Sequence, residues 1–156
     1  MDDIAMMREA LALAQAAADD GEVPVGCVVA MPDGRIVGRG RNRREKGRSA
    51  LAHAELAAIK KASRKLGDWR LEGCTMYVTL EPCCHFGKQP PCVDAIIEHK
   101  IRKVYCGSDD PNAMVAGKGF KRLRDAGIEV YTHCLKAECD AINGIFFKYI
   151  VNKQPY

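Results

Sequence analysis

The sequence predicts a three-layer α/β/α fold in which helices cover both faces of a mixed five-stranded sheet. Short apolar, β-branched runs alternate with segments of helical period along the chain. A turn joins the first two such runs, whereas helices separate the later ones, so antiparallel and parallel neighbours are both expected. The chain has 156 residues and shows no internal repeat or linker. We therefore expect a single domain over residues 1–156.

The first elements are a helix and a β-hairpin. Apolar residues recur at helical spacing over residues 6–17, and Gly21 supplies a stop. The run 25–31 is apolar and β-branched, 32–34 (Pro-Asp-Gly) is a turn signal, and 35–41 returns to an alternating pattern. Two strands around such a turn predict a hairpin.

Helices and strands alternate after the hairpin. Helical patterns cover 53–66, 91–99, 118–126 and 135–151, and strand patterns cover 75–80, 103–106 and 128–132. The helix 118–126 separates the last two strands, with Gly127 as its natural stop. These two strands are therefore expected to run parallel.

Composition gives expectations about the compartment. The chain has no apolar run of membrane-helix length, and its start, Asp2-Asp3, lacks the basic region of a secretory signal. We expect a cytoplasmic protein with no membrane partner. The eight cysteines are then expected to stay reduced. Four of them lie in or beside apolar runs and are expected to act as small core residues: Cys27, Cys74, Cys106 and Cys134.

The net charge of +4 is too small to demand a nucleic-acid partner, but the cations are clustered. Residues 35–48 hold seven Arg or Lys against one acid, Glu45. A second cluster consists of Lys60, Lys61, Arg64 and Lys65. Such clusters attract phosphate. A solvated face without a ligand is an equally good interpretation.

His53, Cys83 and Cys92 predict a catalytic zinc site. Catalytic zinc takes three protein ligands, commonly imidazole and thiolate, and keeps a fourth position for water. Two thiolates and a neutral imidazole balance the charge of Zn²⁺, which lowers the pKa of its water from that of bulk water towards ~7. Cys84 adjoins Cys83 and is an alternative ligand, although as a packed neighbour it needs no function.

Glu55 is predicted to carry protons. It lies two residues after His53, about 200° around a helix at ~3.6 residues per turn, so it is poorly placed to bind the same metal. It is close enough to reach the zinc-bound water and to act as general acid and base. His-x-Glu followed by Pro-Cys-x-x-Cys is the signature of zinc-dependent base deaminases. This chain has eight residues, not two, between its ligand cysteines.

The second half of the chain resembles the pyrimidine deaminase domain of bifunctional riboflavin-biosynthesis enzymes. The likeness is carried by TLEPCCHFGKQPPC at 79–92, DPN at 110–112, VAGKG at 115–119 and FFKYI at 146–150. It implies that Cys83, directly after Glu-Pro, is the ligand. It also implies that His85 and Lys88 bind the ribose phosphate of the substrate. From its position alone, a histidine beside metal ligands could equally well hydrogen-bond to a ligand or simply be exposed.

The first half resembles the bacterial tRNA adenosine deaminases. The likeness is carried by GEVPVG at 21–26, NRRE at 42–45, ALAHAE at 50–55 and LGDWRL at 66–71. The two likenesses meet in the segment that ends at Cys83, so the chain is a hybrid of the two patterns. Asn42 ends the second hairpin strand, and its side-chain amide is predicted to contact a base edge. The alternative is an asparagine that caps or turns the following loop.

Both resemblances imply the cytidine deaminase-like fold, a Zn²⁺ cofactor and a homodimer. The first hypothesis is release of ammonia from the diaminopyrimidinone ribosyl phosphate of riboflavin biosynthesis. The second keeps the chemistry but takes adenosine in tRNA, or a purine base or nucleoside. The third is a non-catalytic zinc or RNA-binding module, which is disfavoured because Glu55 beside an open metal position serves only catalysis. No reductase unit is expected after residues 146–156.

Overall fold

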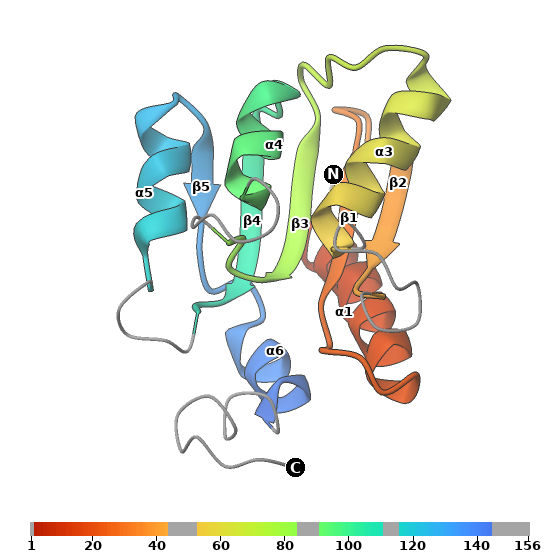
Figure 1. The fold of residues 1–156 in the computed structure, drawn as a ribbon, viewed down its shortest axis with the longest axis vertical. Coiled ribbons are helices and arrows are strands. Elements are labelled where there is room, and N and C mark those ends of the chain that lie inside the picture. The colour runs from red at the N-terminus through yellow and green to blue at the C-terminus, as the bar shows by residue number, and fades with distance from the viewer. Residues whose placement is uncertain (1, 44–52, 84–90, 111–115, 145–156) are drawn as a thin grey trace.

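The computed structural model describes residues 2–43, 53–83, 91–110 and 116–144. Its elements follow the predicted order of helices and strands (Figure 1). They are α1 (Asp3–Asp19), β1 (Gly26–Ala30), β2 (Ile36–Arg41), α3 (Ala54–Leu66), β3 (Thr75–Leu80), α4 (Cys92–Glu98), β4 (Lys103–Ser108), α5 (Lys118–Asp125), β5 (Glu129–Tyr131) and α6 (Lys136–Ile142).

The five strands form one mixed sheet in the order β2-β1-β3-β4-β5. Strand β1 is antiparallel to both β2 and β3, whereas β3, β4 and β5 run parallel. The predicted mixed sheet and the predicted parallel pairing of the last two strands are both confirmed. Because β3 and β4 are parallel, the segments that follow them leave from the same edge of the sheet.

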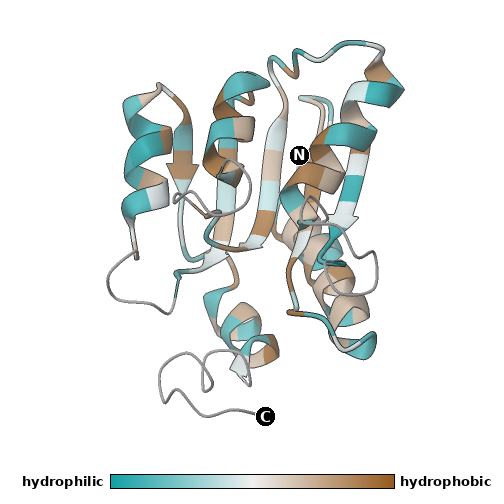
Figure 2. Cartoon of the chain, viewed as in Figure 1, coloured by the Kyte–Doolittle hydropathy of each residue, from teal (hydrophilic) through white to brown (hydrophobic). Residues whose placement is uncertain are grey.

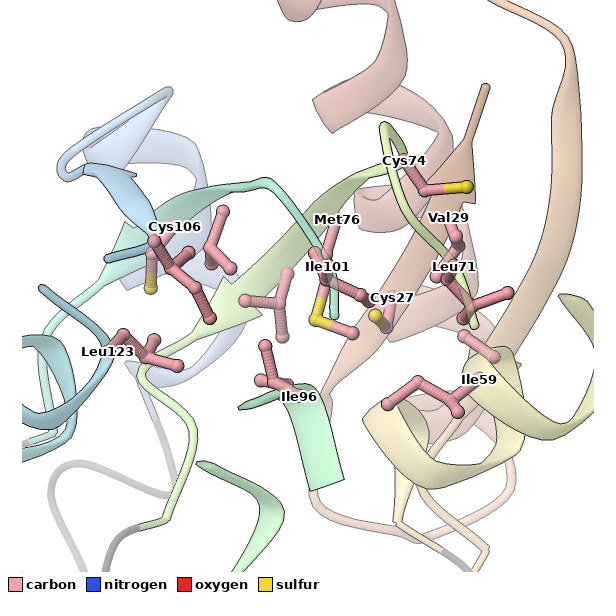
Figure 3. Packing of buried hydrophobic residues seen from close by; sticks show 14 of the residues in the cluster. Cys27, Val29, Ile59, Leu71, Cys74, Met76, Ile96, Ile101, Cys106 and Leu123 are labelled. Atoms are coloured by element: carbon pink, nitrogen blue, oxygen red, sulfur yellow. The ribbon is translucent and has the colours of Figure 1, made fainter. Parts of the chain in front are cut away.

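Helices cover both faces of the sheet, as the three-layer prediction requires. In Figure 1, α3, α4 and α5 lie on one face and α1 and α6 on the other. The side chains of β3 alternate between these layers: Met76 and Val78 belong to the larger apolar cluster (Figure 3), and Tyr77 belongs to the smaller cluster with Met7 and Cys139. Figure 2 shows that hydrophilic residues predominate on α5. Because an apolar cluster lies between the sheet and the helices on each side, both sheet faces are buried.

Close backbone contact fixes the first turn of α3 against the hairpin. A Cβ atom on Gly40 of β2 would lie 2.2 Å from the carbonyl oxygen of Ala54 and 2.7 Å from the nitrogen of Ala58. Glycine leaves the helix room to approach. Because Ala54 lies between His53 and Glu55, this contact also locates two of the predicted site residues.

Two predicted helix boundaries are wrong. His53 is the N-cap of α3 and has an extended backbone. The angular separation predicted between His53 and Glu55 assumed that both residues are helical, so it does not apply. The helix predicted over 135–151 starts one residue later and is interrupted: α6 covers Lys136–Ile142, Asn143 is in a turn, and Gly144 is helical again; the part beyond residue 144 lies outside the described residues. Asn143 follows α6 and donates through Nδ2 to the carbonyl of Cys139 at 2.8 Å.

Three of the four cysteines predicted to lie in the core are buried: Cys27, Cys74 and Cys106. Cys134 is only half-buried, because it follows the last strand in a turn before α6. No disulfide joins the seven cysteines within the described ranges. In the same part of the chain, no helix has the length and apolar character needed to cross a bilayer.

Candidate metal centre and active site

The three predicted ligands come together at the ends of three elements. His53 precedes α3, Cys83 follows β3, and Cys92 is the first residue of α4. Their ligand atoms all lie within 4.8 Å of one another. Cys92 is buried, and the other two are half-buried. Residues up to 39 positions apart are therefore brought into one group near the surface of the molecule.

Local hydrogen bonds hold the two cysteines in register. The backbone N–H of Cys92 donates to Sγ of Cys83 at 3.2 Å, and the N–H of Val93 donates to the carbonyl of Cys83 at 3.1 Å. A backbone N–H aimed at Sγ stabilises the thiolate form, which is the form that binds metal. The start of α4 thus supports the Cys83 thiolate and itself carries Cys92.

The geometry of this cluster fits zinc. In a tetrahedral site, sulfur at ~2.3 Å and nitrogen at ~2.0 Å from the ion lie ~3.5 Å apart. Sγ of Cys92 lies 3.5 Å from Nδ1 of His53. Two sulfurs and one imidazole form a donor set that zinc accepts, and three protein ligands are the number found in catalytic sites.

Glu55 lies in the first turn of α3, beside this cluster, and is 5% exposed. Burial raises the pKa of its carboxyl to about 7, because water no longer stabilises the charge. Its own backbone N–H opposes that shift, Cys83 adds to it, and a hydrogen bond with Cys92 again opposes it. A carboxyl with a pKa near neutrality can both take up and release a proton.

Asn42 follows β2 and is 9% exposed. Its Oδ1 accepts a hydrogen bond from the backbone N–H of Ala54 at 3.3 Å. This contact ties the end of the hairpin to the start of α3, which is the capping role given above as the alternative. The predicted contact with a base stays a prediction.

Glu81 also belongs to the surroundings of the site, although no role was predicted for it from the sequence. It is 5% exposed and accepts hydrogen bonds from the backbone N–H groups of Asp110, Gly117 and Gly119. A glutamate at the end of an apolar strand, two residues before a ligand cysteine, was the available signal. Its partners lie 29 to 38 residues away, so no local pattern identifies them.

The first basic cluster is partly neutralised in the structure. Arg39 faces Glu9 of α1 at 4.0 Å, and Arg41 pairs with Asp20 at 2.7 Å. Residues 44–48, which complete this cluster, lie outside the described residues. The same holds for Cys84, His85 and Lys88, whose roles stay predictions.

The second basic cluster lies on the outside of α3, and all four of its side chains are exposed. Lys60 and Arg64 line an open groove of about 730 Å³ between α3 and α4, together with Trp69 and His99. None of the three proposed metal ligands lines this groove. The chemistry therefore belongs to the ends of α3, β3 and α4.

Residues 1–108 match the family model described as the cytidine and deoxycytidylate deaminase zinc-binding region. This range includes His53, Cys83, Cys92 and Glu55. The chain belongs to this family and has the cytidine deaminase-like fold.

Known relatives carry both resemblances that the sequence showed. The riboflavin biosynthesis protein RibD of Actinobacillus pleuropneumoniae is 46% identical over 158 residues, which span 100% of this chain and 39% of that protein. The tRNA-specific adenosine deaminase of Bacillus subtilis is 37% identical over 152 residues, which span 95% of this chain and 90% of that protein.

Among solved structures, the diaminohydroxyphosphoribosylaminopyrimidine deaminase/5-amino-6-(5-phosphoribosylamino)uracil reductase of Thermotoga maritima superposes with a TM-score of 0.85 at 40% identity. The match covers 99% of this chain and 42% of that one. This chain thus spans about two fifths of the length of each of these two riboflavin-type relatives.

Proposed function

We propose that residues 1–156 form one zinc-dependent deaminase domain that removes the exocyclic amine of a diaminopyrimidinone ribosyl phosphate. The observation that carries the proposal is the convergence of His53, Cys83 and Cys92 within 4.8 Å, with the buried carboxyl of Glu55 beside them. The 46% identity to RibD over the whole chain favours the riboflavin-type substrate.

The proposed chemistry is hydrolysis of a carbon–nitrogen bond. Zinc at these three ligands would supply a Lewis acid that lowers the pKa of a water towards neutrality. Glu55 moves one proton from that water to the ring nitrogen, and then a second proton from the oxygen now bound to the ring carbon to the departing amine. The ring carbon gains oxygen as its bond to nitrogen breaks, so water and the amine yield a carbonyl and ammonia.

Substrate choice is proposed to reside in the segment between the two cysteines. This segment is six residues longer than in the Pro-Cys-x-x-Cys signature. We assign His85 and Lys88 of this segment to the ribose phosphate, as the riboflavin-type likeness implies, and cationic side chains attract phosphate. A homodimer, which the two resemblances imply, is part of this proposal.

The second candidate substrate is adenosine in tRNA. The match to the Bacillus subtilis enzyme spans 90% of that protein, so this chain and that enzyme are similar in extent as well as in sequence. The chemistry at Glu55 would be unchanged, and Asn42 would then contact the base.

One experiment separates the two substrates. Zinc-loaded protein is incubated either with the diaminopyrimidinone ribosyl phosphate or with an adenosine-containing anticodon stem-loop, and ammonia is measured. We expect release from the pyrimidine alone. Release from the stem-loop alone would overturn the proposed substrate and assign specificity to Asn42, whereas release from neither would overturn the proposed function.

Asn42 is expected to contribute to substrate binding in addition to its contact with Ala54. An Asn42→Asp variant keeps the oxygen that accepts the Ala54 N–H but replaces the amide donor. If the amide contacts substrate, KM should rise about tenfold or more, since a lost polar contact in a buried site costs ~1–3 kcal/mol. The melting temperature should stay close to that of the wild type.

Asn42→Ala is the matched variant, because it removes the capping acceptor as well. It should lower the melting temperature and also raise KM. An Asp variant with unchanged KM would show that Asn42 only caps α3.

A further inference from the structure

We infer that Glu81 is a positioning residue that anchors the connection between β4 and α5 to the turn carrying Cys83. The inference rests on the proposed function, because it concerns how that active site is assembled. Glu81 itself is not placed in contact with substrate or metal.

The carboxylate of Glu81 accepts three backbone hydrogen bonds. Oε1 accepts from Asp110 at 3.0 Å and from Gly117 at 3.1 Å, and Oε2 accepts from Gly119 at 3.1 Å. Asp110 lies beyond the end of β4, whereas Gly117 and Gly119 lie at the start of α5. One side chain thus holds both described ends of this connection.

The backbone of Glu81 is fixed as well. Its N–H donates to the carbonyl of Ser108 at 2.9 Å, which continues the pairing of β3 with β4 past the strand ends. Because the two strands are parallel, the segments after them leave the sheet side by side. Glu81 lies two residues before the Cys83 ligand, and its side chain therefore contacts the connection between β4 and α5.

The contact between α5 and this turn leaves no space. A Cβ atom on Gly119 would lie 2.6 Å from the carbonyl oxygen of Pro82 and 3.2 Å from Oε2 of Glu81. The α5 start therefore packs directly on the residue before Cys83. A shift of α5 would move the turn that carries Cys83, and a shift of that turn would move α5. Closely packed backbone atoms leave no free volume that could absorb such a movement.

These contacts explain why Glu81 is buried although it takes no part in the proposed chemistry. A buried carboxylate is costly unless hydrogen bonds compensate it, and three N–H donors do so here. The bonds join the Cys83 turn to a connection in which 110–112 and 115–119 carry the riboflavin-type likeness. We therefore expect Glu81 to govern how substrate is presented to the metal centre.

The test uses Glu81→Gln and Gly119→Ala, which disturb the same contact from its two sides. Glutamine has one carbonyl oxygen, so at least one N–H loses its acceptor and meets the NH₂ group instead. Alanine at 119 introduces the close approach described above. The matched controls are Glu72→Gln, at an exposed glutamate, and Gly144→Ala, where an added Cβ would meet no atom within 4 Å.

Both test variants should bind zinc at one ion per chain and fold at 25 °C. At that temperature we expect KM to rise about tenfold, with kcat within about threefold, because a small misplacement of positioning groups weakens substrate binding before it removes the catalytic acid. Hydrogen exchange of the Asp110, Gly117 and Gly119 amides should accelerate in Glu81→Gln. The two control variants should match the wild type in every readout.

Two results would overturn the inference. The first is a lower melting temperature with KM and kcat unchanged at 25 °C, which would make Glu81 a residue for stability alone. The second is unchanged exchange at the three amides. If the wild-type protein released no ammonia from any substrate, the proposed function would fail, whereas exchange and zinc content would still test the anchoring.

Discussion

Glu55→Gln should lower kcat about a thousandfold, because general acid–base catalysis contributes ~10²–10⁴ in rate. Glutamine has nearly the same shape but cannot take a proton from water and return it to the ring. Zinc content should stay at one ion per chain, since Glu55 is not among the three proposed ligands. Ammonia release in a single-turnover assay, with zinc measured on the same sample, checks both expectations.

The effect of Glu55→Gln on stability separates catalysis from folding. Burial raises the pKa of the Glu55 carboxyl, which means that the site disfavours the charged form. A neutral amide should therefore be tolerated, and the melting temperature should not fall. Glu98→Gln, an exposed position at the far end of α4, serves as the control. Unchanged turnover in Glu55→Gln would contradict the proton-transfer role of Glu55, whereas unchanged biological activity without ammonia release would support the non-catalytic zinc-module hypothesis.

Most of the fold could be predicted because its signals are local. The alternation of Met76, Tyr77 and Val78 between two apolar layers is a period-two pattern that burial on both sheet faces produces. The parallel pairing of β4 with β5 follows from the helix between them. The metal ligands were predictable for a similar reason, since zinc restricts the residue types and each ligand lies at the end of a predicted element.

Contacts between distant backbone groups could not be predicted in this way. The three N–H partners of Glu81 depend on how β4 and α5 lie against β3, which no local pattern records. The pairs that Arg39 and Arg41 form with Glu9 of α1 and with its C-cap Asp20 are similar, because charge counting along the chain cannot show which face a helix covers. His53 also differs from expectation, because the apolar period of α3 does not show that the helix starts one residue later.

Cys83→Ser should weaken zinc binding by at least about a hundredfold, since changes to partners of metal ligands alone cost ~10–100-fold and this change removes a ligand. A serine hydroxyl stays protonated at neutral pH and is a poor substitute for a thiolate. It also lies further from the Cys92 N–H that Sγ of Cys83 accepts at 3.2 Å. Ammonia release should fall in proportion to zinc content, measured by metal analysis after competition with a chelator.

Cys84→Ser is the matched control, because it makes the same change one residue along the chain. Sγ of Cys83 lies in the cluster with His53 and Cys92, so this variant should keep its zinc and most of its activity. The reverse pattern, with zinc lost from Cys84→Ser and retained in Cys83→Ser, would assign the ligand to Cys84. Equal, partial losses in both would mean that the two thiols exchange at the metal, since either could then satisfy the third position. Only the first outcome agrees with a turn held by the N–H groups of Cys92 and Val93.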